Sequence, residues 1–337
     1  VNYAGQPQPE QGIIVKFNGS HWVDQTGRTW DNSVKFSLPD KDVFALDANA
    51  NPPVPVAGPA GVYAGVGSVL FNMVVNPASG KVYVSNTDAN NFDRFEGPGT
   101  FTGHSLRAHL HESRISVLNA GTSTSRHLNK HINYNACCAA TPNVENARSL
   151  AQPLDMAISA DGSMLYVAAF GSSKVGVFRT AQLENDTFVP DTANQFRVSG
   201  GGPSGLALDE GRNRLYVLTR FDNSISVIDT RTGAEQRHLA MNNPEPASVT
   251  VGRRFLYDAS YTSGNGESAC GSCHVFGDFD SLAWNLGNPD GDNLANPSRL
   301  QLFPGIPNGD PAFRPLKGPM MTQSLRGMDN HGPMHWR

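Results

Sequence analysis

The chain has 337 residues, of which 17% are charged, with a formal net charge of −4 and a pI near 6.2. This balance offers no basic surface for nucleic acid or an anionic membrane, and no apolar run approaches the ~20 residues that span a bilayer. Its 34 glycines and 23 prolines favour many short strands joined by tight turns over a helical bundle. The length predicts about two domains with a sizeable core.

The amino-terminal stretch predicts three strands, at residues 13–17, 34–38 and 42–47, which are expected to form a blade of the repeat described next. The chain begins at Val1 without an initiator methionine or the basic and apolar regions of a secretory signal. It ends at Arg337 inside a dense motif region. We therefore expect a mature form or a fragment, with further protein after Arg337.

A repeated pattern of short strands follows, with a period of roughly 40–50 residues. Each copy has an apolar run, a turn rich in Asp, Asn or Gly, a strand centred on Tyr, and a later apolar run. The three clear copies are 73–77, 80–86 and 115–118; 153–158, 165–167 and 175–178; and 203–208, 215–217 and 225–229. A fourth copy is expected to open at residues 246–249 and to reach Phe255-Leu256-Tyr257.

This period and these hairpin turns are typical of propeller blades, which cannot bury both faces alone. The Leu-Tyr-Val cores and the Ser-Val-Ile-Asp run of the third copy resemble the YVTN family of β-propellers, over roughly residues 60 to 250. The alternative is a β-sandwich with coincidental repetition. About four blades are visible, fewer than such propellers usually close with (~4–8), so we expect the missing blades on another part of the polypeptide.

The strongest chemical signal is Cys270-Gly271-Ser272-Cys273-His274. Two thiols separated by two residues can each add to a haem vinyl group, and the adjacent histidine can then serve as the proximal iron ligand. Two other interpretations exist. Half a zinc site would need a second cysteine pair nearby, and a thioredoxin-like pair would need a βαβ context. The sequence around the motif has neither.

Three segments around this motif resemble bacterial di-haem cytochrome c peroxidases and their MauG-like relatives. The run from Phe255 to Cys270 is similar to the family's Leu-Phe-Phe-Asp lead-in, Ser-x-x-Gly turn and haem motif. Residues 321–326 resemble its Thr-Pro-Thr-Leu segment, and 334–337 its Phe-Trp-Asp-Gly-Arg segment. The resemblance implies that 252–337 is the first haem domain of such a protein, with a second haem beyond Arg337 if the chain is truncated. It also implies that Trp336 lies between haems; the alternative is a packing residue.

The sixth ligand of the iron separates peroxidase chemistry from electron transfer. The family places a displaceable histidine after the attachment motif, yet no histidine occurs here between His274 and His331, which puts the usual peroxidase activity in doubt. The remaining candidates are Met320, Met321, His331 and His335. Met320 is favoured because a methionine ligand suits electron transfer.

Further polar residues are weaker candidates. Two histidine groups, with surface roles as the alternative, are His104, His109 and His111, and His127 and His131. Adjacent Cys137 and Cys138 allow either a strained ring disulfide or two thiols. Residues 290–293 (Asp-Gly-Asp-Asn) offer oxygen ligands for calcium, which the peroxidase family often holds, or a solvated turn.

The sequence as a whole predicts a mainly β protein, with a partial β-propeller over 1–251 and a small α-helical cytochrome c-type domain over 252–337. Covalent haem c implies the bacterial periplasm or cell surface. We expect an electron donor or acceptor protein as partner, and further haem domains of the same protein. The function is then either that of a peroxidase-like oxidoreductase, whose propeller binds substrate or partner, or that of an electron-transfer or structural module without bond chemistry.

Overall fold

The computed structural model describes residues 13–35, 41–93, 106, 109–136, 139–287, 294–295, 312–313 and 316–328. The chain divides into two compact units. The smaller consists of Val1–Ser37, Asn90–Leu110 and Ser281–Gln323, and the larger of Leu38–Ala89, His111–Asp280 and Ser324–Arg337. None of the helices in the described ranges is long and apolar enough to cross a membrane.

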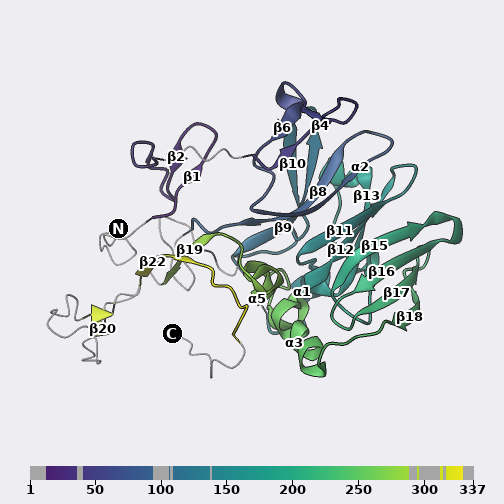
Figure 1. Ribbon diagram of the computed structural model, residues 1–337. Coiled ribbons are helices and arrows are strands. Elements are labelled where there is room, and N and C mark those ends of the chain that lie inside the picture. The colour runs from purple at the N-terminus through teal and green to yellow at the C-terminus, as the bar shows by residue number, and fades with distance from the viewer. Residues whose placement is uncertain are drawn as a thin grey trace. The chain divides into compact units, whose positions relative to one another are not determined.

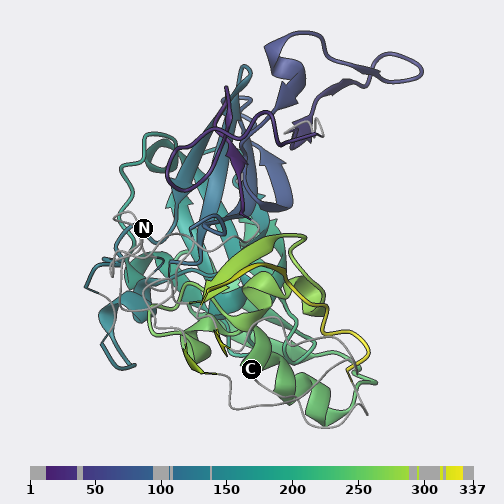
Figure 2. The same cartoon turned by 90° about the vertical axis from the view of Figure 1, so that its left-hand side faces the viewer.

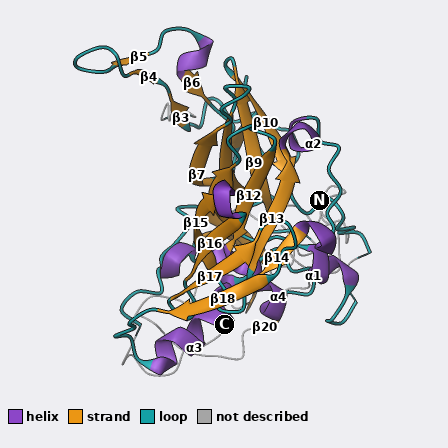
Figure 3. Ribbon diagram, turned by 90° about the vertical axis from the view of Figure 1, so that its right-hand side faces the viewer, coloured by secondary structure: helices purple, strands orange, loops and turns teal. Residues whose placement is uncertain are grey.

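Three four-stranded antiparallel sheets dominate the larger unit (Figures 1 and 3). Blade 1 contains β7 (Val69–Val75), β8 (Val82–Ala89), β9 (His111–Asn119) and β10 (Thr122–His127). Blade 2 contains β11 (Pro153–Ile158), β12 (Met164–Ala169), β13 (Lys174–Arg179) and β14 (Gln195–Arg197). Blade 3 contains β15 (Pro203–Asp209), β16 (Arg214–Thr219), β17 (Ser224–Asp229) and β18 (Glu235–Ala240). In every sheet the strands follow in chain order, which is consistent with propeller blades and confirms the three clear repeats.

Apolar residues from facing sheets form the cores between the blades. Tyr83, Ile115 and Leu165 are fully buried between blades 1 and 2, and Leu215 and Ile228 between blades 2 and 3. Alternate residues of a strand point to opposite faces, so each blade presents one apolar set to the blade before it and another to the blade after it. This packing explains why the Leu-Tyr-Val pattern recurs.

The first strands of the three blades are linked by one carboxylate. Asp155 of β11 accepts a hydrogen bond from Asn72 Nδ2 of β7 at 2.5 Å and another from the backbone N–H of Leu206 in β15 at 2.7 Å. A charged acceptor strengthens both bonds. Asp155 therefore fixes the register of adjacent blades at their inner edge.

The prediction of a fourth copy of the repeat is wrong, because residues 247–257 form the helix α3 (Ala247–Tyr257) and not strands. Pro246 occupies its N-cap position. Near its end, Arg254 Nε lies 3.6 Å from Asp258 Oδ2, four residues later. At the end of the helix, the Tyr257 ring packs against Phe170 and Phe221. Packing of this ring has overridden the strand propensity of the valines in the segment.

The small helical cytochrome domain is likewise not evident in the described residues after 252. They contain the end of α3, the four-residue helices α4 (Ala259–Thr262) and α5 (Cys270–Cys273), and then strands. In Figures 1 and 2 the three helices, drawn in green, lie together at one end of the blades. Glycine and serine are frequent between α4 and α5, which interrupts any longer helix. Residues 252–280 belong to the same compact unit as the blades, and the boundary at 252 stays a prediction.

The prediction of an amino-terminal blade is also wrong for the described residues. Two short hairpins stand in its place in the larger unit, pairing β3 (Val43–Phe44) with β6 (Val62–Tyr63) and β4 (Leu46–Asp47) with β5 (Val54–Pro55). Strands of two residues provide too few cross-strand pairs to build a stable sheet. The segment 34–35 forms no strand, and 36–40 lie outside the described residues.

The smaller unit contains three further pairs of strands. These are β1 (Lys16–Phe17) with β2 (Trp22–Val23), β19 (Ala283–Gly287) with β22 (Leu316–Met321), and β20 (Leu294–Ala295) with β21 (Ala312–Phe313). The remaining elements of the molecule are α1 (Val144–Arg148), α2 (Thr180–Glu184) and the 3₁₀ turns η1 (Pro59–Gly61), η2 (Phe170–Ser172), η3 (Thr192–Asn194), η4 (Glu210–Arg212) and η5 (Val275–Gly277).

Candidate functional site

Cys270, Cys273 and His274 lie together on a single turn, which we name the attachment turn (residues 270–274). Cys270 and Cys273 form the first and last residues of α5, and the backbone N–H of His274 closes it by donating to Cys270 O at 2.9 Å. Residues three apart in a helix share a face, so both side chains point to the same side. Both cysteines are free thiols, with Cys270 exposed and Cys273 half-buried.

The attachment turn is held against α3 by a close approach at Gly271. A Cβ atom at this position would lie 2.8 Å from Tyr257 Cε1 and 3.1 Å from Leu256 O. Ser272 adds a local bond, because its Oγ accepts the backbone N–H of Ala269 at 3.0 Å. The turn therefore sits on a rigid base, as a site for a covalently held group requires.

The two thiols differ in their environment. Burial, together with the charges of Asp280 and Cys270, raises the pKa of Cys273 to about 12. Since the thiolate is the reactive form, we expect iodoacetamide at pH 8 to alkylate Cys270 of the haem-free protein while Cys273 stays unmodified. Peptide mass spectrometry checks this, with urea-unfolded protein as the control in which both react. Equal labelling in the native protein would contradict the structure.

The residues of the turn fit a covalently attached haem. Two unpaired thiols face the same side, and a histidine follows directly, which is the donor set of a c-type haem. Just beyond it, Phe276 and Phe279 are 53% and 41% exposed. Exposed rings beside the two thiols form an apolar surface that a porphyrin would cover.

Part of the segment that resembles the Thr-Pro-Thr-Leu motif lies beside this site. The backbone N–H of Leu325 donates to Gly277 O at 3.0 Å, and Arg326 Nε lies 3.2 Å from Asp278 Oδ2. These bonds fix the chain near residue 325 next to the loop that follows the attachment turn. The sequence resemblance placed the two segments in one domain but did not identify this contact.

The predicted sixth ligands lie in the smaller unit or outside the described residues. Met320 and Met321 lie in β22 of the smaller unit, opposite Trp284 and Ala283 of β19. His331, His335 and Trp336 lie outside the described residues, as do His104, Cys137, Cys138 and residues 290–293. Within the described ranges, no group of three or more His, Cys, Asp or Glu side chains is arranged to hold a metal ion. The roles of Met320 and Trp336 stay predictions.

Two of the candidate histidines lie beside the segment that precedes the attachment turn. His111 Nδ1 is 3.1 Å from Ser268 Oγ, and His127 Nε2 is 2.7 Å from Glu267 Oε1. His131 instead bonds to Glu145 O at 2.9 Å. No local sequence pattern connects blade 1 with residues 267–268, so this polar contact was not predicted.

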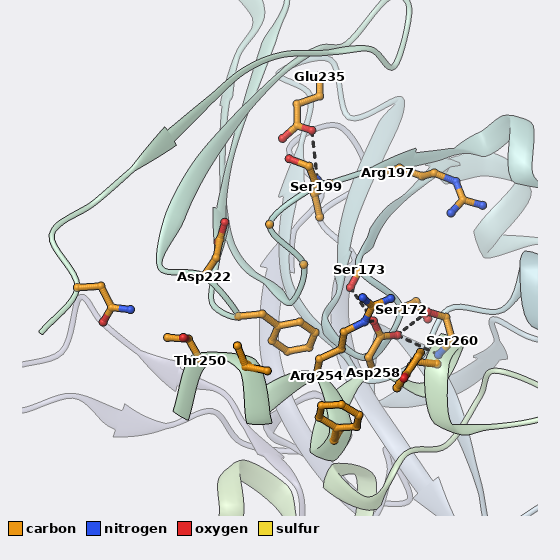
Figure 4. A pocket seen from close by; sticks show the side chains of 18 residues that line it. Ser172, Ser173, Arg197, Ser199, Asp222, Glu235, Thr250, Arg254, Asp258 and Ser260 are labelled. Carbon is orange, nitrogen blue, oxygen red and sulfur yellow. Dashed lines mark hydrogen bonds and ion pairs between the residues drawn. The ribbon is translucent and has the colours of Figure 1, made fainter. Parts of the chain in front are cut away.

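A cavity of about 770 Å³ opens in the larger unit between loops of blades 2 and 3 and the helices α3 and α4 (Figure 4). Asp222 and Glu235 of blade 3 lie on one side. His238 Nε2 is 2.6 Å from Asp222 Oδ2, and His238 Nδ1 is 3.3 Å from Glu235 Oε1. Arg254 and Asp258 lie on the other, near Ser173. Both acidic and basic side chains line the cavity, so it suits a ligand with polar groups and without a strong net charge.

Aromatic rings connect the wall of this cavity with the attachment turn. Phe221, which lines the cavity, stacks on Tyr257 with ring centroids 6.3 Å apart and an interplanar angle of 22°. Phe170 meets the same tyrosine edge-on at 5.2 Å. Because Gly271 rests on the Tyr257 ring, this ring lies between the cavity wall and the attachment turn.

No model of a known protein family matches the chain, and no curated protein does. Among solved structures it is similar to hydrazine synthase of Kuenenia stuttgartiensis, at 16% identity and a TM-score of 0.35, over 51% of this chain and 48% of that one. It is similar to the periplasmic gluconolactonase of Pseudomonas aeruginosa, at 15% identity and a TM-score of 0.32, over 55% and 45%. A third similar structure is dihydro-heme d1 dehydrogenase, at 11% identity and a TM-score of 0.29, over 50% and 27%. The chain thus covers about half of the length of these proteins or less.

Proposed function

We propose that this chain is a c-type haem redox protein of the bacterial periplasm or cell surface, an oxidoreductase resembling the di-haem cytochrome c peroxidase and MauG group. The observation that carries the proposal is the attachment turn, where Cys270 and Cys273 are the first and last residues of one helical turn and His274 is its C-cap. Covalent attachment takes place outside the bacterial cytoplasm, which is the reason for the proposed compartment. An electron donor or acceptor protein, and further haem domains of the same protein, are the proposed partners.

In this proposal each residue of the turn has a defined role. The Sγ–H bonds of Cys270 and Cys273 add across the two vinyl groups, so that each sulfur bonds to carbon and the proton goes to the neighbouring carbon. His274 would supply an imidazole nitrogen to the iron. The bound haem provides one-electron transfer, and the protein provides orientation and electrostatics. The YVTN-type propeller and its cavity beside Tyr257 provide the proposed binding site for a polar substrate or partner segment.

Replacing Cys270 and Cys273 together with alanine is expected to abolish covalent haem, because no thioether can form. Haem staining of a denaturing gel after expression with a c-type maturation system checks this. The matched control replaces Cys137 and Cys138 with alanine and is expected to keep the stain. Haem that stays on the polypeptide without Cys270 and Cys273 would refute the proposal.

A second function, electron transfer without bond chemistry, is favoured by one observation. The chain has methionines at 320, 321 and 328 but no histidine between His274 and His331. Methionine ligation closes the sixth position and raises the potential. The visible spectrum separates the two functions, since a methionine-to-iron charge-transfer band supports the carrier and a high-spin, cyanide-binding iron supports the peroxidase-like enzyme.

A further inference from the structure

The carboxylate of Glu267 is fully buried three residues before the attachment turn. Its Oε1 accepts hydrogen bonds from His127 Nε2 at 2.7 Å, Asn129 Nδ2 at 3.0 Å and the backbone N–H of Ser113 at 3.3 Å. Its Oε2 accepts the hydroxyl of Tyr134. A carboxylate without access to water needs donors of this number to remain stable, so this is a built anion site inside the protein.

The donors keep this carboxylate ionised. Burial acts to raise the pKa of Glu267, but the hydrogen bond and charge of His127, followed by the hydrogen bond from Tyr134, outweigh it and hold the pKa below its usual value. In the same site, burial and the Glu267 charge raise the pKa of Tyr134. The proton therefore stays on the phenol and the negative charge on the glutamate.

The groups around Glu267 leave an excess of negative charge. From blade 1, Glu112 lies 3.9 Å from His127 Nδ1, and Arg114 pairs with both Glu112 and Asp88. The other titratable groups facing Glu267 are His111, His127, His131 and Tyr134. Asp88, Glu112 and Glu267 together carry three negative charges against the one of Arg114, so a proton on His127 still leaves a net negative cluster.

This charge lies close to the attachment turn that would hold the proposed haem. Three residues span at most about 10 Å, which limits the distance between the Glu267 and Cys270 backbones. The segment between them is fixed, because Ser268 bonds to His111 and the N–H of Ala269 to Ser272. A buried negative charge at this range stabilises ferric over ferrous haem, since oxidation adds a positive charge to the iron site.

We propose that Glu267 is a positioning residue that fixes the attachment turn on blade 1 and lowers the reduction potential of the haem through its buried negative charge. This inference rests on the proposed function, since it requires the haem. It adds a specific electrostatic role for a residue outside the Cys-x-x-Cys-His motif.

The test is a spectroelectrochemical titration of the full, haem-loaded chain in three forms. Glu267→Gln keeps the shape and removes the charge, and it is expected to shift the midpoint potential upward. Glu267→Asp keeps the charge but shortens the side chain, and it is expected to stay near the wild-type potential. A purely structural role predicts the reverse order, because aspartate fits the donors worse than glutamine does. Glu210→Gln is the control: it makes the same change at an exposed glutamate and should leave the potential unchanged.

The outcomes are distinguishable. A wild-type chain without covalent haem overturns the proposed function, whereas attached haem with equal potentials in wild type and Glu267→Gln overturns this inference alone. If Glu267→Gln does not carry haem, Tyr134→Phe replaces it. That variant keeps the carboxylate but removes one donor, so the charge is less compensated and the potential should fall. An unchanged or raised potential in Tyr134→Phe would then reject the proposal.

Discussion

Replacing Leu165 with alanine is expected to lower the free energy of unfolding by about 2–5 kcal/mol. Leu165 is fully buried in β12, the second strand of blade 2, and packs in the core between blades 1 and 2. On one side it is opposite Ile158 of β11, and on the other opposite Phe178 of β13. Strands on both sides prevent the site from collapsing, so the cavity left by the leucine remains and the upper part of the range applies.

Leu218→Ala is the matched control for this change. Leu218 lies in β16, the corresponding strand of blade 3, but is 37% exposed. The same atoms are removed from a side chain that still contacts water, so we expect a loss below about 1 kcal/mol. Urea unfolding followed by far-UV circular dichroism measures both variants. Equal losses would show that the cores between blades do not stabilise the protein in the way the burial of Leu165 indicates.

The sequence was sufficient to predict the first three strands of each blade, because their pattern reflects packing that is repeated. The fourth strands β10, β14 and β18 were missed, since β10 and β18 carry mainly polar residues (Thr-Ser-Thr-Ser-Arg-His and Glu-Gln-Arg-His-Leu-Ala). The helix α3 was predicted as strand because it is rich in apolar residues. Its Val249, Val251 and Phe255 are 44%, 64% and 56% exposed, so apolar residues that suggested a buried strand are largely exposed on a helix.

The chemistry of the candidate site was predictable only where it is local in sequence. Cys270, Cys273 and His274 are within five residues, so their spacing alone places them on one turn. Glu267 and its partners on blade 1 are more than 130 residues apart, and nothing in a single sequence pairs a glutamate with a histidine at that distance. The same holds for Tyr257, whose position between Gly271 and Phe221 follows from packing of α3 and not from a motif.

Replacing Gly271 with alanine is expected to destabilise the folded protein by about 1–3 kcal/mol and to reduce the yield of covalent haem. The new Cβ would meet the Tyr257 ring at 2.8 Å from Cε1, and Leu256 O at 3.1 Å. Phe170 and Phe221 pack against the same ring, with centroids 5.2 and 6.3 Å away. The ring therefore has no room to move, and the attachment turn itself has to shift. Urea unfolding and haem staining per mole of protein measure the two effects.

Gly252→Ala provides the control with the opposite sign. Gly252 lies within α3, and a Cβ built there meets no atom within 4 Å. Alanine is favoured over glycine inside a helix by about 0.8–1.0 kcal/mol, so this variant should be slightly more stable and keep its haem. Because α3 carries both Gly252 and Tyr257, the pair of variants separates loss of the helix from loss of its contact with the attachment turn. If Gly271→Ala keeps wild-type haem yield and stability, the turn does not depend on Tyr257 for its position, and the aromatic connection to the cavity loses its structural basis.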